Sequence, residues 1–89
     1  MTARDIPMRI AVTGLGVVSS LGRDQREFWA SLTEGRCGIG RFDLFDPAGC
    51  LSDVAGQVRA PLPSGRRLTR TDRLCLMAAA EAVEQAGLA

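Results

Sequence analysis

Residues 10–22 read IAVTGLGVVSSLG, an apolar run broken by glycines, and the interpretation of the whole chain depends on this stretch. The aliphatic residues from Met8 to Thr13 follow one another almost without interruption, which is typical of a strand buried on both faces of a sheet. The glycines that follow have two explanations. They form a loop that binds the phosphates of a dinucleotide, or they let the backbone pack closely against a neighbouring element.

The dinucleotide explanation fits these glycines poorly. A phosphate-binding loop has the pattern GxGxxG directly before a helix, so that the helix N-terminus faces the pyrophosphate. Gly14 and Gly16 match the first two glycines, but Ser19 stands at the third position and the next helix is predicted to begin only near Asp24. The sequence therefore favours close packing at the glycines, with Ser19 and Ser20 supplying hydrogen bonds in a turn. No cofactor is predicted.

A helix is predicted to follow this stretch. Asp24 can accept hydrogen bonds from the first backbone amides of a helix while Glu27 reaches back, which is the capping-box pattern. Gly35 is typical of the left-handed residue that ends a helix. The connection over residues 36–52 contains three glycines and a proline without a sustained period, and it predicts an irregular loop.

Two further elements are predicted after this loop. Residues 53–59 alternate weakly and predict a short edge strand, in which Gly56 marks a bulge or a close approach of another backbone. Residues 71–86 are rich in Ala, Leu, Met and Glu and predict a helix that is capped by Thr69 or Thr71 and stops at Gly87. The first half of this helix has almost no polar face, so it needs cover on several sides.

The size of the chain limits how well that helix can be covered. A domain of 89 residues buries only about 60% of its unfolded surface. Two strands and two helices offer too little apolar surface to cover the last helix, so its side chains need partners from elsewhere. We therefore expect a fragment, or a subunit completed by other chains.

The charge pattern excludes several classes of function. A net charge of +1, with 24% charged residues, is too small for a nucleic-acid binder. The longest apolar stretch, residues 74–80, is far shorter than the roughly 20 residues of a membrane span. In the sequence RFDLFDP, we expect Asp43 and Asp46 to form side-chain turns or a cap beside Pro47 rather than an acid–base pair. We expect a cytoplasmic protein that binds neither nucleic acid nor membrane.

The cysteines and the missing histidine limit catalysis. Cys37, Cys50 and Cys75 are an odd number without a CxxC spacing, so they predict neither a disulfide framework nor a zinc site. Cys75 is expected to be buried in the last helix, where burial makes a thiol inert. Histidine, the usual general base and activator of a nucleophile, is absent. The sequence predicts no catalytic cysteine and no metal site.

Several segments in the same order and spacing resemble the N-terminal segment of the elongating β-ketoacyl-acyl-carrier-protein synthases (KAS II-like), the condensing enzymes of fatty acid and polyketide synthesis. The resemblance runs from about Arg9 to Ala89. It rests on VTGLGVVSSLG, REFWASLTEGRCGIG, RFDLFDP, VAGQV and TRTDRLCLMAAAEAVEQAGL.

The resemblance implies the thiolase-like fold, in which two similar α/β halves form a five-layered αβαβα structure. Residues 1–89 would be part of the first half and not a complete domain: a buried strand, a capped helix, a long loop, a short strand and a buried helix. It also implies decarboxylative Claisen condensation of an acyl thioester with malonyl-carrier, by a homodimer or a ketosynthase heterodimer. The family's catalytic cysteine, in a TACAT-like motif, and its two histidines match no residue here, so the chain alone is expected to be inactive.

A group of arginines is the remaining candidate site. Arg66, Arg67, Arg70 and Arg73 would form a basic stripe if the last helix extends back to about Ser64. The resemblance implies that basic residues just before this helix dock the acidic acyl carrier protein, and Arg66 and Arg70 match such positions. The alternative is a solvated helix end whose charge is partly balanced by acidic neighbours.

Two hypotheses from different classes stay open. In the first, the chain is the N-terminal part of a condensing enzyme and has no activity by itself. In the second, it is a separate truncated module that binds an acidic carrier protein or a synthase partner without chemistry. A fragment of a dinucleotide-binding domain is a third explanation, which titration with NAD or NADP would detect.

Overall fold

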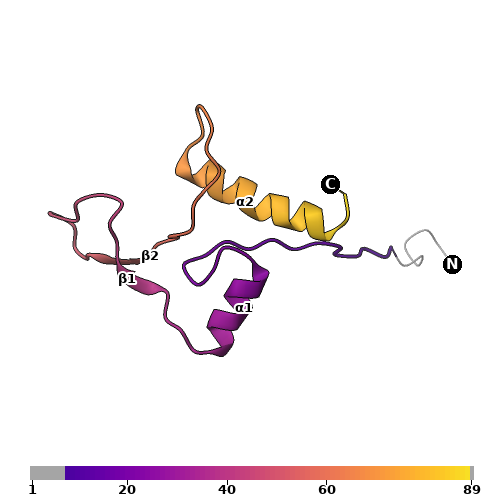
Figure 1. The fold of residues 1–89 in the computed structure, drawn as a ribbon, viewed down its shortest axis with the longest axis horizontal. Coiled ribbons are helices and arrows are strands. Elements are labelled where there is room, and N and C mark those ends of the chain that lie inside the picture. Colours follow the sequence, from indigo (N-terminus) through magenta and orange to yellow (C-terminus); the bar gives the residue numbers. More distant parts are fainter. Residues whose placement is uncertain (1–7, 89) are drawn as a thin grey trace.

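The computed structural model describes residues 8–88 of the chain. These residues form two helices and a two-stranded sheet, in the order α1 (Gln25–Thr33), β1 (Ile39–Arg41), β2 (Val54–Gly56) and α2 (Arg70–Gln85). The extended residues 8–18 run between α2 and α1, while the sheet lies to one side of both helices (Figure 1). Residues 1–7 and 89, which the predicted domain includes, lie outside the described residues.

Capping residues determine where both helices begin, as the sequence predicts. The Asp24 carboxylate accepts a 2.8 Å hydrogen bond from the amide of Glu27. The Glu27 carboxylate reaches back to the amide of Arg23 at 3.0 Å, one residue before the expected position. In α2 the box is complete, because Thr69 and Asp72 each accept a 3.1 Å bond from the other's amide.

The two helices end in the same way. Gly35 and Gly87 follow α1 and α2 with φ of +72° and +75°, the left-handed region in which glycine carries no steric penalty. After α1, the amide of Gly35 bonds to the Leu32 carbonyl and the amide of Arg36 to the Ser31 carbonyl, and equivalent bonds close α2. The predicted stops at both glycines are confirmed.

The sheet differs from the prediction in one strand. β2 lies within the predicted edge strand, but β1 lies inside residues 36–52, where an irregular loop was expected. The two strands pair antiparallel, with Ile39 opposite Gly56 and Arg41 opposite Val54. A three-residue strand flanked by glycine has too few residues to show a period of two, so its partner across the sheet decides its conformation.

The glycine-rich stretch, residues 10–22, ends in a turn at residues 19–22 that packs against this sheet. Ser19 makes the hydrogen bonds of the turn, since its amide and carbonyl both bond to Gly22. The side chain of Ser20 lies against the sheet instead, where a Cβ added to Gly38 or Gly56 would meet its hydroxyl. The predicted bulge or backbone approach at Gly56 is wrong, because the strand pairs regularly there and the group that approaches it is a side chain.

Neither the buried strand nor the buried helix of the prediction is buried here. Residues 8–13 are extended but have no partner strand among residues 8–88, because β1 and β2 pair with each other. In α2 no residue is buried, and Cys75 is exposed. Both elements are exposed because the chain is too small to supply the apolar surface that would cover them, as its size predicts.

The described residues contain no apolar core. No hydrophobic side chain among them is buried, and Ser31 is the one buried polar residue. The Cα radius of gyration is 18.1 Å, whereas a compact domain of this length has about 12 Å. The fold shown is thus a small mixed α/β arrangement whose apolar faces lack cover. Within residues 8–88, neither helix has the length and hydrophobicity to cross a bilayer.

The lack of a core predicts the behaviour of the isolated 89-residue chain. We expect it to be insoluble, self-associating or molten, because uncovered apolar area is worth about 25 cal/mol per Å². Dye binding by 8-anilinonaphthalene-1-sulfonate should be strong, and thermal unfolding should be broad. A monomer with a single sharp unfolding transition and no dye binding would contradict this prediction.

Candidate functional site

The glycine-rich stretch lies directly on one face of α2. A Cβ added to Gly14 would collide with the carbonyl oxygen of Ala82, and one added to Gly16 would collide with that of Ala78. Ala78 and Ala82 are one turn apart on the helix, so two small side chains and two glycines face each other. The prediction of close packing at these glycines is confirmed.

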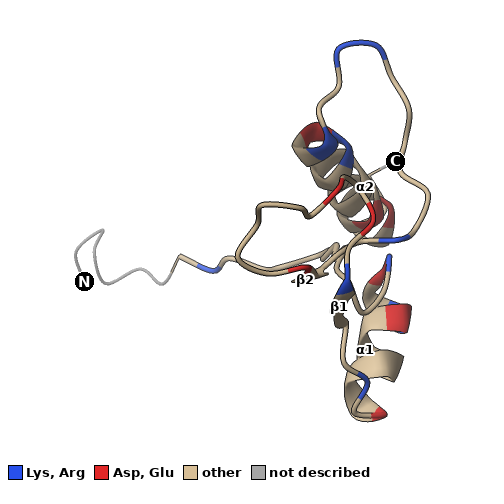
Figure 2. Cartoon of the chain, turned by 90° about the vertical axis from the view of Figure 1, so that its left-hand side faces the viewer, with Lys and Arg blue, Asp and Glu red and all other residues tan. Residues whose placement is uncertain are grey.

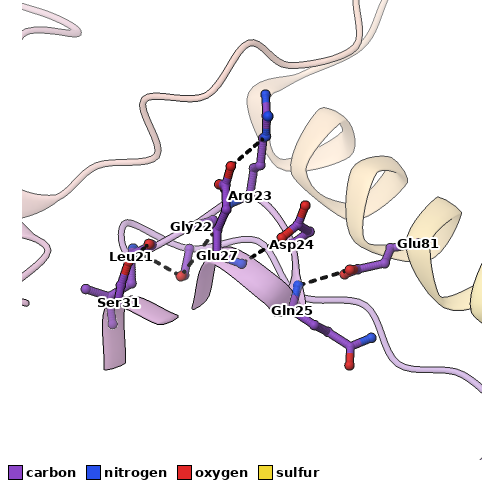
Figure 3. Close-up of polar contacts among 9 residues, drawn as sticks. Leu21, Gly22, Arg23, Asp24, Gln25, Glu27, Ser31 and Glu81 are labelled. Carbon is purple, nitrogen blue, oxygen red and sulfur yellow. Dashed lines mark hydrogen bonds and ion pairs between the residues drawn. The ribbon is translucent and has the colours of Figure 1, made fainter. Parts of the chain in front are cut away.

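Polar side chains on the same face of α2 accept hydrogen bonds from backbone amides of this stretch and of the start of α1. The Glu81 carboxylate accepts a 2.9 Å bond from the amide of Val17 and a 3.0 Å bond from the amide of Gln25. One turn later, the Gln85 side-chain oxygen accepts a 2.7 Å bond from the amide of Leu15. Gln25 is the first residue of α1, so Glu81 places a carboxylate at the N-terminus of that helix, as Figure 3 shows.

This arrangement leaves no place for a dinucleotide phosphate. A phosphate would need the free amides of the glycine stretch and the start of the next helix. Here the backbone at Gly14 and Gly16 is pressed against α2, and the α1 start is occupied by the Glu81 carboxylate. The glycine-rich stretch instead packs against α2, and Glu81 of α2 joins it to the start of α1.

Glu81 and Gln85 are not among the residues that the sequence predicts to have a role. The sequence does contain a pattern that includes them. Ala78, Glu81, Ala82 and Gln85 follow the spacing i, i+3, i+4 and i+7, so they share one face of a helix. Two alanines beside two long polar side chains on one helix face indicate a face that can approach a backbone and accept hydrogen bonds from it. Which backbone it contacts does not follow from the pattern.

The candidate arginines do not form one helical stripe. α2 begins at Arg70, so the condition for the stripe, a helix that extends back to about Ser64, is not met. Arg66 and Arg67 lie in a turn instead, and Arg67 has φ of +62°. The capping box of Thr69 starts the helix at this point and so leaves both arginines in the loop. Figure 2 shows basic residues at the tip of this loop and at the start of α2.

The three candidate arginines differ in what they contact. The Arg70 guanidinium donates a 2.7 Å bond to the Val58 carbonyl and so ties the start of α2 to the segment after β2. Arg66 and Arg67 are exposed. None of the three takes part in an ion pair with another described residue. The loop therefore presents positive charge that the described part of the chain does not neutralise directly.

The acidic pair has a structural role. Asp46 accepts a 3.0 Å bond from the amide of Ala48, which confirms the predicted side-chain turn. Asp43 instead accepts bonds from Gln57 at 2.8 Å and from Arg59 at 2.9 Å, across the end of the sheet. The Gln57 amide, followed by the Arg59 guanidinium, lowers the pKa of the Asp43 carboxyl. The ionised Asp43 carboxylate therefore links the segment after β1 to the segment after β2.

Cys37, Cys50 and Cys75 are free cysteines. All three are exposed, which corrects the expected burial of Cys75: the described residues cover α2 too little to bury any of its side chains. Among residues 8–88, no three carboxylate, thiol or imidazole side chains gather closely enough to hold a metal ion.

Comparison with known proteins points to one family. Residues 8–89 match the family model described as "Beta-ketoacyl synthase, N-terminal domain". The chain is 41% identical over 90 residues to the tetracenomycin polyketide synthase ketoacyl synthase beta subunit of Streptomyces glaucescens, covering 92% of this chain and 22% of that protein. It is 34% identical over 87 residues to the chloroplastic 3-oxoacyl-[acyl-carrier-protein] synthase I of Hordeum vulgare, covering 90% of this chain and 19% of the relative.

A bacterial relative matches a shorter part of the chain. The 3-oxoacyl-[acyl-carrier-protein] synthase 1 of Escherichia coli (strain K12) is 47% identical over 51 residues, which cover 57% of this chain and 13% of the relative. The chain spans about a fifth of the length of the first two curated relatives. No solved structure matches it significantly.

The close contact at Gly16 predicts the effect of an added methyl group. In a complete synthase that carries this chain, Gly16→Ala should lower the free energy of unfolding by about 1–3 kcal/mol, because the methyl group would overlap the Ala78 carbonyl. Gly40→Ala is the matched control, since no atom lies within 4 Å of a Cβ at that position. Urea denaturation measures both, and equal effects would contradict the observed contact.

The double hydrogen bond of Glu81 predicts a second effect. In the same synthase, Glu81→Gln replaces one acceptor oxygen by a donor, so one of the two amides loses its partner. The free energy of unfolding should fall by about 1–3 kcal/mol. Glu84→Gln, an exposed substitution on the same helix, should change it little. Slower hydrogen exchange at Val17 in the Glu81→Gln variant than in the parent would speak against the bond.

Proposed function

This chain belongs to the β-ketoacyl synthase family, and from this premise we propose that it forms the opening part of a condensing enzyme. The single observation that carries the proposal is the match to the family over residues 8–89. The proposed reaction is the decarboxylative Claisen condensation of an acyl thioester with malonyl-carrier protein, in fatty acid or polyketide synthesis. The proposed site of action is the cytoplasm, as a homodimer or a ketosynthase heterodimer.

The proposed fold of the complete enzyme is thiolase-like, with residues 1–89 in its first half. Two observations support this placement. Residues 8–13 have the near-continuous apolar pattern of a strand in the middle of a parallel sheet, and they lack a partner here. The α2 helix has one face on the glycine stretch and exposes Leu76 and Val83 elsewhere. Further layers of the proposed fold would cover both.

The chemistry would come from residues outside this chain. The sequence has no histidine to stabilise an enolate or to activate a thiol. The three cysteines are exposed and have no described basic partner. We therefore assign no catalytic residue here. An assay of the synthase that carries this chain should show loss of carbon dioxide from malonyl-carrier protein with transfer of an acyl primer. Absence of condensation would contradict the proposed function.

The role proposed for this chain in that reaction is recognition of the acyl carrier protein by Arg66, Arg67 and Arg70. Support comes from the exposed loop before α2, which carries two guanidinium groups that no described carboxylate pairs with. Arg70 adds charge beside them, while its bond to the Val58 carbonyl limits its movement. An acidic partner would be attracted to this loop over a distance of several ångströms.

Charge reversal tests the carrier site. In a complete synthase that carries this chain, Arg66→Glu with Arg67→Glu should weaken binding of an acidic acyl carrier protein by about tenfold at low salt. The loss should shrink as salt rises, because ions screen exposed charges. Fluorescence anisotropy of a labelled carrier protein measures the dissociation constant. Unchanged binding at low salt would remove the proposed site.

Three further variants separate recognition from folding. Arg36→Glu makes the same change of charge per residue at an exposed position after α1, and it should leave binding unchanged. Arg67→Gly removes a charge at a positive φ that glycine adopts freely, so it should weaken binding without lowering the melting temperature. Arg70→Glu should lower both binding and stability, because the bond to Val58 is lost as well.

A further inference from the structure

The loop between β2 and α2, residues 57–69, is held near its start by bonds to the segment after β1. The Arg59 guanidinium donates a 2.9 Å bond to the Asp43 carboxylate and a second bond to the Arg41 carbonyl. The Gln57 side chain bonds to Asp43 in both directions: its amide donates to the carboxylate at 2.8 Å, and its oxygen accepts from the Asp43 backbone amide at 3.0 Å. One aspartate thus holds two of the first three residues of the loop.

The same short segment is held again where the loop ends. The Arg70 guanidinium, in the first turn of α2, donates a 2.7 Å bond to the carbonyl of Val58, which lies between the two residues that Asp43 holds. From this base the loop projects beyond the start of α2 (Figure 2). The orientation of its tip therefore depends on how firmly the base is held.

The tip of the loop, residues 65–68, has a defined shape of its own. Arg67 has φ of +62°, and a Cβ added to Gly65 would meet the Leu68 side chain at 2.5 Å, so the chain turns tightly here. Two prolines fix φ between the base and the tip. A tip with little internal freedom moves as a unit, so a shift at the base would carry its two guanidinium groups along.

We propose that Asp43 is a positioning residue for recognition of the acyl carrier protein. Through Arg59 it holds the base of the loop, and thereby the orientation in which Arg66 and Arg67 meet the carrier. The proposal rests on the carrier site proposed above and adds to it a residue that acts through the loop. Binding to a loop that is already ordered costs less conformational entropy than binding to one that must first be ordered. Loss of the Asp43 carboxylate should therefore weaken carrier binding.

Charge alone gives the opposite expectation for Asp43. A carboxylate beside a basic docking loop repels an acidic partner, so its removal should strengthen binding if electrostatics were the whole effect. The sign of the change in affinity therefore separates positioning from charge.

A matched pair of aspartate variants tests this sign. In a complete synthase that carries this chain, Asp43→Ala should weaken binding of a labelled acyl carrier protein about three- to tenfold, measured by fluorescence anisotropy. Asp46→Ala removes the same charge at an exposed position three residues later, where the carboxylate bonds to the local amide of Ala48. It should leave the dissociation constant within about twofold of the parent value. Unchanged or tighter binding by the Asp43→Ala variant, or an equal loss in both variants, would overturn the proposal.

A double-mutant cycle shows whether Asp43 acts through the arginines of the tip. In a synthase that already carries Arg66→Glu and Arg67→Glu, Asp43→Ala should add less than about a twofold loss, because the groups that it positions no longer bind. A full further loss would show another route of action and overturn the proposal. If charge reversal weakens binding and Asp43→Ala does not, the carrier site stands and the positioning role fails. If charge reversal itself changes nothing, the carrier site fails and the positioning role fails with it.

Kinetics separate positioning from a general structural effect. Asp43→Ala should raise the KM for malonyl-carrier protein several-fold and leave kcat close to the parent value, because the residue lies outside the proposed chemistry. The KM for a malonyl thioester of a small thiol, which has no carrier protein to dock, should stay close to the parent value. An equal rise in both KM values would overturn the proposal.

Discussion

The carboxylate of Glu81 joins the three parts of this structure that pack together. It accepts from the amide of Val17 in the glycine stretch and from the amide of Gln25 at the start of α1, while its own backbone belongs to α2. Both amides would otherwise lack a protein partner, because neither lies inside a helix ladder or a strand pair. The small side chains on either side of Glu81 then allow the backbone at Gly14 and Gly16 to approach the helix.

Hydrogen bonds of this kind orient the segments but do not enclose an apolar core. The described residues bury no hydrophobic side chain, and the faces left open include those of residues 8–13 and of α2. Relatives about five times as long contain far more chain with which to cover the same elements. A chain this short can therefore carry well-specified local structure and an exposed basic loop, and still lack the partner surface that an interior needs.

Local signals in the sequence predicted local structure well. The caps at Asp24 and Thr69 and the stops at Gly35 and Gly87 each depend on contacts within one helical turn, so a single sequence contains them. Strand pairing between residues far apart in the sequence was harder to predict. β1 takes its conformation from a partner about 15 residues away, and residues 8–13 lack any partner that could bury them. At the candidate site, the sequence indicated the arginines, whose role stays a prediction. It did not show that the Arg70 guanidinium bonds to a backbone carbonyl or that Glu81 holds two amides.

The separation of Glu81 from its partners has a consequence for biosynthesis. The two amides precede it by 64 and 56 residues. At a translation rate of about 5–20 residues per second, roughly 3–13 s pass between the synthesis of Val17 and that of Glu81. During that interval the glycine-rich stretch leaves the ribosome before the helix that holds it has been made. The glycine-rich stretch therefore waits several seconds for the helix against which it packs, and chaperones that bind extended apolar peptides have time to meet it.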